Sequence, residues 1–460
     1  MKRKRTYKAT RVEQVRLETL LPVLAAGCIV ALDVAKQKFL VALATLAGEV
    51  VEVFRFDHPT ETRKFLSLVS ELGAHVAPGQ LKVAMEPTGT YGDAVRQQLV
   101  AQGRTVCMVA PKRTHDSQAL FDNVSSLHDA KSAVLVAKLC SMGLSTEWTE
   151  PHPTRRRLRA LIELRGHDLA QEERCFGRIE ALLARHWPEF GRWMDAREQK
   201  SALKLLAKYP SPARVHAERQ TVRAFLSETS RGQLSAELIE GVVTEAGATL
   251  GVPMFPEEEL QLSALAKQAL ESRQRADGLE AEMEKLAEGD EVFGRLKRLM
   301  GRYSAAVIVT LCDPRQYAKA GQLEKACGLN LKEKSSGEHA GRVSLTKRGP
   351  ALVRKILYLF ALRMIQQSPV TRAWYMKRRG YTEESKQRAV VAVMRKLARA
   401  IFHVARGEEF DDHKLFDVRR LNLDAVSAPA SRRSKRRSTP RAIARGKKRS
   451  QATAPALAST

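Results

Sequence analysis

The chain has 460 residues, with 78 Lys or Arg against 51 Asp or Glu, and its formal net charge is +27 at pH 7. This balance indicates a polyanionic partner, nucleic acid or an anionic membrane surface, and a hydrophobic content of 44% is enough to form more than one core. No apolar run approaches the roughly 20 residues that span a bilayer, and the six cysteines form no CxxC pair, which argues against a membrane protein, a disulfide scaffold and a structural zinc site.

Residues 1–24 are predicted to form a basic N-terminal arm, since the first 11 residues carry six Lys or Arg and no acid. The run from Leu24 to Cys28 is similar to a lipoprotein cleavage box, but Glu13 and Glu18 precede it and few apolar residues lie before the cysteine. We therefore expect a cytoplasmic protein without a membrane anchor.

Residues 25–145 are predicted to form an α/β domain with a mixed sheet. Apolar runs predict strands over residues 28–32, 39–45 and 50–56, and then over 81–85 and 105–110. Helical patterns cover residues 61–72, 91–102 and 127–141. Three strands followed by alternating strands and helices are typical of a mixed sheet covered by helices.

The rest of the chain is predicted to be helical. Residues 146–291 form a connector, and residues 257–288 of this connector suit a long amphipathic helix or coiled-coil arm whose partner the pattern leaves open. Residues 292–424 form a second helical domain with helices over 293–311, 321–327, 352–366 and 384–406, and a polar loop over 330–349. Residues 425–460 carry ten Lys or Arg and no acid, and are predicted to be a disordered, nucleic-acid-attracting tail.

Three carboxylates stand at element ends in the first domain. Asp33 ends the first strand, Glu86 ends the strand over 81–85, and Asp129 opens a helix. Oxygen ligands of this kind suit Mg²⁺ or Mn²⁺, which can neutralise phosphate oxygens and activate an attacking hydroxyl. The alternative is that the three acids only cap a strand, a turn and a helix.

A second candidate site is the polar loop that carries Ser335 and Ser336. A serine can attack phosphorus where cations offset the phosphate charge, although Ser-Ser-Gly is also an ordinary turn sequence. The cations of this loop and its flank, which we expect to contact nucleic acid, are Lys334, Arg342, Lys347, Arg348 and Arg354.

The helix over 384–406 carries four arginines within about 20° of one line on its surface. They form either a stripe that tracks phosphates or a solvated basic face. These arginines are Arg388, Arg395, Arg399 and Arg406.

With these positions laid out, the chain resembles the DEDD transposases of the insertion-sequence "one-ten" type, which are related to pilin-gene inverting enzymes. The N-terminal stretches that carry the resemblance are Ile29-Val30-Ala31-Leu32-Asp33-Val34-Ala35-Lys36, Val83-Ala84-Met85-Glu86-Pro87-Thr88-Gly89-Thr90-Tyr91, Ala110-Pro111 and His128-Asp129-Ala130-Lys131-Ser132-Ala133. The C-terminal stretches are Asp313-Pro314-Arg315-Gln316-Tyr317, Gln322-Leu323, Gly328-Leu329, Ser336-Gly337, Gly341-Arg342-Val343, Thr346-Lys347-Arg348-Gly349 and Arg354.

The resemblance implies an RNase H-like (RuvC-like) first domain that holds a metal through Asp33, Glu86 and Asp129, and a helical transposase domain that supplies Ser336. In such a protein the serine forms a transient 5′-phosphoserine link to DNA. The resemblance also implies a homo-oligomer, a dimer or tetramer, a structured noncoding guide RNA, and DNA as substrate in the bacterial cytosol or nucleoid.

Two positions depart from the family pattern. Ser132 stands at the fourth acidic position, so either three acids suffice, Asp116 or Asp122 substitutes, or this copy is impaired. Arg302 follows Met300-Gly301 where relatives show a Pro-Gly-x-Gly turn. The alternatives to a serine recombinase are a metal-dependent nuclease or junction resolvase without a covalent intermediate, and an inactive nucleic-acid-binding copy.

Overall fold

The computed structural model describes residues 9–87, 89–120, 129–333 and 344–423, with the backbone alone for Asp129. The chain divides into two compact units, residues 1–150 and 151–460. Within the described ranges, no helix combines the length and apolarity that a membrane crossing requires.

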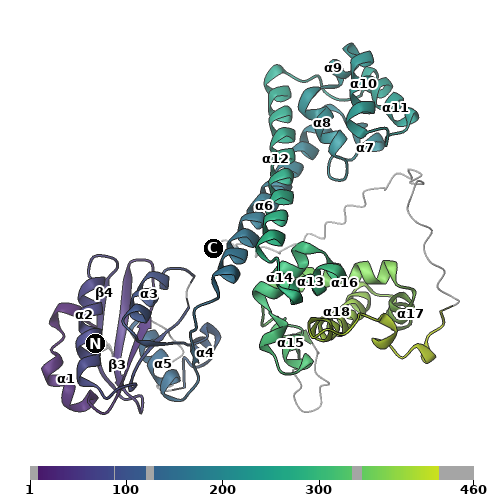
Figure 1. The fold of residues 1–460 in the computed structure, drawn as a ribbon. Helices are drawn as coiled ribbons and strands as arrows, with labels where there is room; N and C mark the ends of the chain where they lie inside the picture. Colours follow the sequence, from purple (N-terminus) through teal and green to yellow (C-terminus); the bar gives the residue numbers. More distant parts are fainter. Residues whose placement is uncertain (1–8, 88, 121–128, 334–343, 424–460) are drawn as a thin grey trace, which may run out of the picture. The chain divides into compact units, whose positions relative to one another are not determined.

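Unit 1 is built on one mixed sheet (Figure 1). Its central strands are β2 (Cys28–Asp33), β3 (Lys38–Thr45), β4 (Val50–Asp57), β5 (Leu81–Met85) and β6 (Thr105–Met108), and two-residue strands β1 (Thr10–Arg11) and β7 (Thr146–Glu147) lie at the edges. The order is β1-β4-β3-β2-β5-β6-β7. β3 runs antiparallel to both β2 and β4, whereas β5 is parallel to β2 and to β6. The predicted mixed sheet is confirmed.

The two faces of this sheet carry side chains of different size. Alternation along β2 sends Val30 and Leu32 to one core and Ile29 and Ala31 to the other. The core with the larger side chains packs against α1 (Leu17–Leu24), α2 (Thr62–His75) and α3 (Asp93–Ala101). On the other face, α5 (Asp129–Ser141) packs against a surface rich in alanine.

Residues 10–24 belong to this fold and are not a separate arm. They form β1, a short 3-10 turn and α1, and their residues Val12, Leu17 and Leu24 are buried. Apolar residues at helical spacing account for this packing, although the segment is also basic. The strand predicted over 105–110 ends at Met108, because Pro111 opens the short helix α4 (Pro111–Asp116).

Unit 2 contains two long helices, α6 (Pro153–His186) and α12 (Pro256–Leu286), which lie side by side (Figure 1). Their ion pairs run in opposite order along the two helices, from Arg165–Glu280 to Glu172–Arg273 and on to His186–Glu258, so the helices are antiparallel. The predicted long helix therefore has a partner within its own chain. Between the two helices, the chain forms α7 (Phe190–Trp193), α8 (Lys200–Lys208), α9 (Pro212–Ala217), α10 (Arg219–Ser230) and α11 (Ala236–Gly247) around a separate core.

The last part of unit 2 has its own apolar core. Its elements are α13 (Glu291–Met300), α14 (Arg302–Leu311), α15 (Ala320–Ala326), β8 (Leu331–Lys332), β9 (Ser344–Leu345), α16 (Ala351–Gln367), α17 (Pro369–Arg378) and α18 (Glu383–Ala405). The single helix predicted over 293–311 is wrong. Gly301, with φ at 86°, ends α13 and begins α14, a conformation that glycine adopts without strain.

Candidate metal centre and serine hairpin

Asp33 and Glu86 occupy matching positions at one edge of the sheet. β2 and β5 are parallel neighbours, and Leu32 is paired with Met85, so the next residue on each strand is one of these two acids. Strands in this arrangement lie about 4.8 Å apart, which brings the two carboxylates within reach of a shared ion. Both residues are partly exposed and both take part in polar interactions.

The direction of α5 brings its first residue to the same edge. A Cβ placed on Gly48 would lie 2.4 Å from Oγ of Ser141, so the end of α5 lies beside the turn that follows β3. That turn follows Thr45, which is paired with Cys28 at the start of β2. A helix of 13 residues and a strand of six both span about 17–18 Å. Because the last residue of α5 lies near the start of β2, its first residue, Asp129, lies near the end of β2.

Two further residues of the first turn of α5 are buried. Ser132 is 6% exposed and Lys131 only 3% exposed. Ser132 follows Asp129 by three residues and therefore lies on the same side of the helix. Lys131 was not singled out from the sequence, although a buried lysine at the start of α5 requires an interaction partner within the protein, and it has one.

The donor set fits a hard divalent cation, since two carboxylates and a hydroxyl are oxygen ligands. Among the side chains that the structure describes, no three His, Cys, Asp or Glu lie close enough to hold a metal, but the side chain of Asp129 is outside that description. Of the two substitute acids, Asp116 binds Lys112 at 2.8 Å on the exposed helix α4, and this hydrogen bond lowers the pKa of its carboxyl. Asp122 lies outside the described residues.

Ser336 also lies outside the described residues, as do Ser335, Lys334 and Arg342, but the hairpin that carries them is defined at its base. β8 and β9 are antiparallel, with Leu331 opposite Leu345, and the N–H of Thr346 donates to the carbonyl of Asn330 at 2.8 Å. Next to this base, the segments before and after the hairpin cross in close contact at two glycines.

Gly349 and Gly328 form that crossing. A Cβ on Gly349 would lie 2.2 Å from the carbonyl oxygen of Ala326 and 2.8 Å from the N of Gly328. Arg354 fixes the crossing, because its Nη1 donates to the carbonyl of Gly349 at 2.6 Å. Lys347 and Arg348 are exposed beside it, and Lys347 has a positive φ of 54°.

The arginines of α18, and Arg406 directly after it, have acceptors within the protein. Arg395 and Arg399 both bind the carboxylate of Glu324, at 2.5 and 2.6 Å. Arg406 donates to the carbonyl of Tyr317 at 2.6 Å, and Arg388 pairs with Glu384 at 2.8 Å. Arg388 and Arg399 are still mostly exposed, so a role in binding phosphates stays a prediction for these two.

Two family models match the chain. Residues 30–188 match the model for DEDD transposases of the IS110 type, described as a transposase, and residues 296–376 match the "Transposase IS116/IS110/IS902 family". The first match contains the acids at the sheet edge, and the second contains the serine hairpin.

Two individual proteins are also similar. The insertion element IS116 uncharacterized 44.8 kDa protein of Streptomyces clavuligerus is 23% identical over 308 residues, which cover 65% of this chain and 76% of that protein. Among solved structures, T. thermophilus RuvC in complex with a Holliday junction substrate is 12% identical, with a TM-score of 0.21, and covers 26% of this chain and 99% of that chain.

Proposed function

We propose that this chain, which belongs to the IS110 family of transposases, cuts and rejoins DNA through Ser336, assisted by a divalent-metal site at Asp33, Glu86 and Asp129. The observation that carries the metal site is the register of β2 and β5, which sets Asp33 and Glu86 side by side. The direction of α5 supports Asp129 as the third ligand, and Ser132 would complete the ligand set.

The bound ion, Mg²⁺ or Mn²⁺, would offset the negative charge on the phosphate. In the proposed step, the hydroxyl oxygen of Ser336 bonds to phosphorus while the bond from phosphorus to the 3′ oxygen breaks. The hydroxyl proton passes to a base, and the 3′ oxygen leaves as a hydroxyl after taking up a proton. Because the 5′-phosphoserine ester keeps a phosphate ester bond, the reverse attack by another 3′ hydroxyl rejoins the strand.

The net charge of +27 supports binding to nucleic acid over a large surface. We propose that the partners are the DNA of the element and its target, together with a structured noncoding RNA from the element that selects them. A homo-oligomer, a dimer or tetramer working in the bacterial cytosol or nucleoid, would bring two DNA duplexes together. The cations of the serine hairpin, Lys334, Arg342, Lys347 and Arg348, would contact the strands.

Covalent trapping tests the proposed function. The full chain is mixed with Mg²⁺, RNA transcribed from the flanking noncoding DNA, and labelled DNA that spans the element junction. Denaturing electrophoresis should then show a detergent-stable protein–DNA adduct. We expect the adduct to be lost in Ser336→Ala and in Asp33→Ala, and to persist in the matched control Ser335→Ala.

The replacement of the fourth acid by Ser132 leaves two other functions to be tested by the same assay. Nicked DNA without an adduct, unaffected by Ser336→Ala, would identify a metal-dependent nuclease or junction resolvase that attacks with water. Binding of DNA and RNA without either product would identify an inactive copy.

A further inference from the structure

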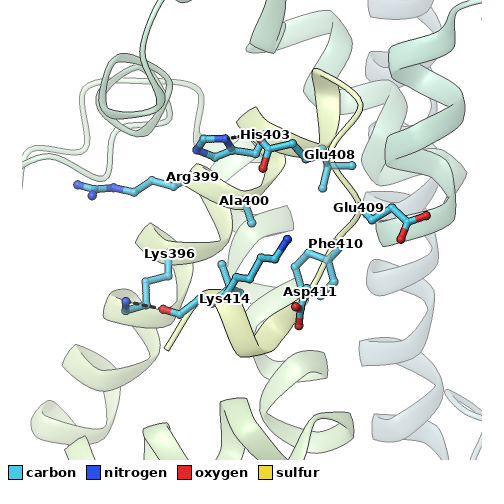
Figure 2. A pocket seen from close by; sticks show the side chains of 11 residues that line it. Lys396, Arg399, Ala400, His403, Glu408, Glu409, Phe410, Asp411 and Lys414 are labelled. Carbon is cyan, nitrogen blue, oxygen red and sulfur yellow. Dashed lines mark hydrogen bonds and ion pairs between the residues drawn. The ribbon is translucent and has the colours of Figure 1, made fainter. Parts of the chain in front are cut away.

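A hollow of about 330 Å³ lies between α18 and the chain that follows it. Figure 2 shows that Ala400 and His403 of α18 line one side, and that Phe410 and Lys414 of the following segment line the other. Ala400 is buried at the base and Phe410 is partly exposed, so the hollow has an apolar floor and an aromatic wall.

Three cations, Lys396, Arg399 and Lys414, and three acids, Glu408, Glu409 and Asp411, line this hollow. Arg399 shares the single carboxylate of Glu324 with Arg395, which leaves one positive charge in excess. Lys396 donates to the carbonyl of Leu415 at 2.7 Å, and no carboxylate within the described part of the chain forms an ion pair with it. Burial lowers the pKa of Lys396, and the positive charges of Arg399 and Arg378 add to this effect.

Two of these acids accept hydrogen bonds at the rim, and the third is exposed. The carboxylate of Glu408 binds Nδ1 of His403 at 2.7 Å, and Oδ1 of Asp411 accepts from the N–H of His413 at 2.9 Å. Glu409 is exposed. Lys414 is also exposed and has no carboxylate partner among the described residues, and Figure 2 shows its side chain extending across the hollow.

We propose that this hollow binds one unpaired nucleotide of a single-stranded nucleic acid, with its base against Phe410 and its phosphate held by Arg399 and Lys414. A volume near 330 Å³ falls in the range of small-ligand sites. Every base offers a flat face to an aromatic ring, and cations beside the ring bind the backbone. A base inside a duplex is stacked on its neighbours and is not available to the ring.

The proposal rests on the proposed function only in taking nucleic acid as the partner, because none of its residues belongs to the proposed catalytic set. Binding can therefore be measured without catalysis, on the full-length Ser336→Ala protein in EDTA. A loss of cleavage activity then leaves the binding result unchanged, and the two proposals fail separately.

Photocrosslinking tests the base contact. Two single-stranded probes of about 12 nucleotides and the same sequence, one RNA and one DNA, each carry a 5-iodouracil base. After irradiation and proteolysis, we expect a crosslinked peptide that contains Phe410, and we expect unlabelled single strand to compete with it better than duplex does. The stronger of the two probes identifies the source of the nucleotide. A crosslink to this peptide from neither probe would overturn the proposal.

Two variants separate binding from folding. Phe410→Leu keeps the apolar packing but removes the ring, and should weaken single-strand binding about tenfold. Lys414→Gln changes an exposed charge, and should weaken binding about threefold and reduce the salt slope by about 0.7. The control Lys204→Gln makes the same change at an exposed site on α8 and should bind as the parent does. Parental affinity in both Phe410→Leu and Lys414→Gln, by fluorescence anisotropy, would also refute the site.

Discussion

The carboxylate of Glu324 on α15 accepts a hydrogen bond of 2.5 Å from Nε of Arg395 on α18. The side chain of Glu324 is only 5% exposed, so water contributes little to its solvation. The second bond, from Arg399 one turn further along α18, completes the neutralisation of the carboxylate. This triad joins the helix before the serine hairpin to the helix that lines the proposed nucleotide site.

Glu324→Gln should lower the free energy of unfolding of unit 2 by about 2–3 kcal/mol, because two arginines lose the buried negative charge that both of them bind. Glu163→Gln is the matched control, since Glu163 pairs with Arg159 on the surface of α6 with both side chains more than 60% exposed. It should cost less than about 0.5 kcal/mol. Urea unfolding followed by circular dichroism measures both, and equal losses would contradict the buried triad.

Two glycines of the connector should respond to alanine in opposite directions. In Gly251→Ala, the new Cβ would lie 2.0 Å from the backbone oxygen of His186, so the backbone must move, at a cost of about 2 kcal/mol. In Gly278→Ala, nothing lies within 4 Å of the new Cβ on α12, and the helix should gain about 0.5–1 kcal/mol. Thermal unfolding should give a melting temperature below that of the parent for Gly251→Ala and above it for Gly278→Ala.

Alkaline pH should destabilise unit 1 in part through Cys28. Burial raises the pKa of this thiol to about 11, whereas a thiol in the unfolded chain ionises at about 8.5. A raised pKa stabilises the folded state below the unfolded value, and this contribution is lost as the pH rises from about 8.5 to 11. Cys28→Ala should therefore lose less stability than the parent over this interval in urea titrations. Identical pH profiles would show that the thiol does not contribute.

Replacing Ser132 by Asp should strengthen metal binding. Ser132 is buried one turn after Asp129, near the start of α5, where the helix dipole favours a negative charge. A further carboxylate raises the affinity of an oxygen site, and we expect Mn²⁺ to bind about tenfold more tightly in calorimetric titrations. Ser227→Asp makes the same change on the exposed face of α10 and should leave the affinity unchanged. An unchanged affinity in Ser132→Asp would show that this side chain does not face the ion.

The sheet was predictable because its strands are short apolar runs that end at charged or turn residues. Asp33 and Glu86 were found for the same reason, since each directly follows such a run. Their pairing depends on β2 and β5 being parallel neighbours, which the order of strands in a mixed sheet suggests but sequence spacing does not fix.

Contacts between distant segments, and the break of a helix at a single glycine, could not be predicted from the sequence. The spacing of Arg395 and Arg399 correctly puts them on one side of α18, but their partner Glu324 lies 71 and 75 residues away. The break at Gly301 was missed because a single glycine weakens a helix by only about 1 kcal/mol and often lies inside one. The antiparallel contact of α12 with α6 joins segments more than 70 residues apart.

The alanine-rich face of the sheet has a consequence for the proposed metal site. Ala31, Ala42, Ala44 and Ala84 place small side chains beneath α5, so their size contributes to the height of that helix above the strands. The third acid is carried by the helix and the other two by the strands. A larger residue at any of these four positions would raise the helix and stretch the triangle of acids without touching one of them. In the proposed metal site, the small size of these four alanines is therefore needed for the spacing of the acids as well as for packing.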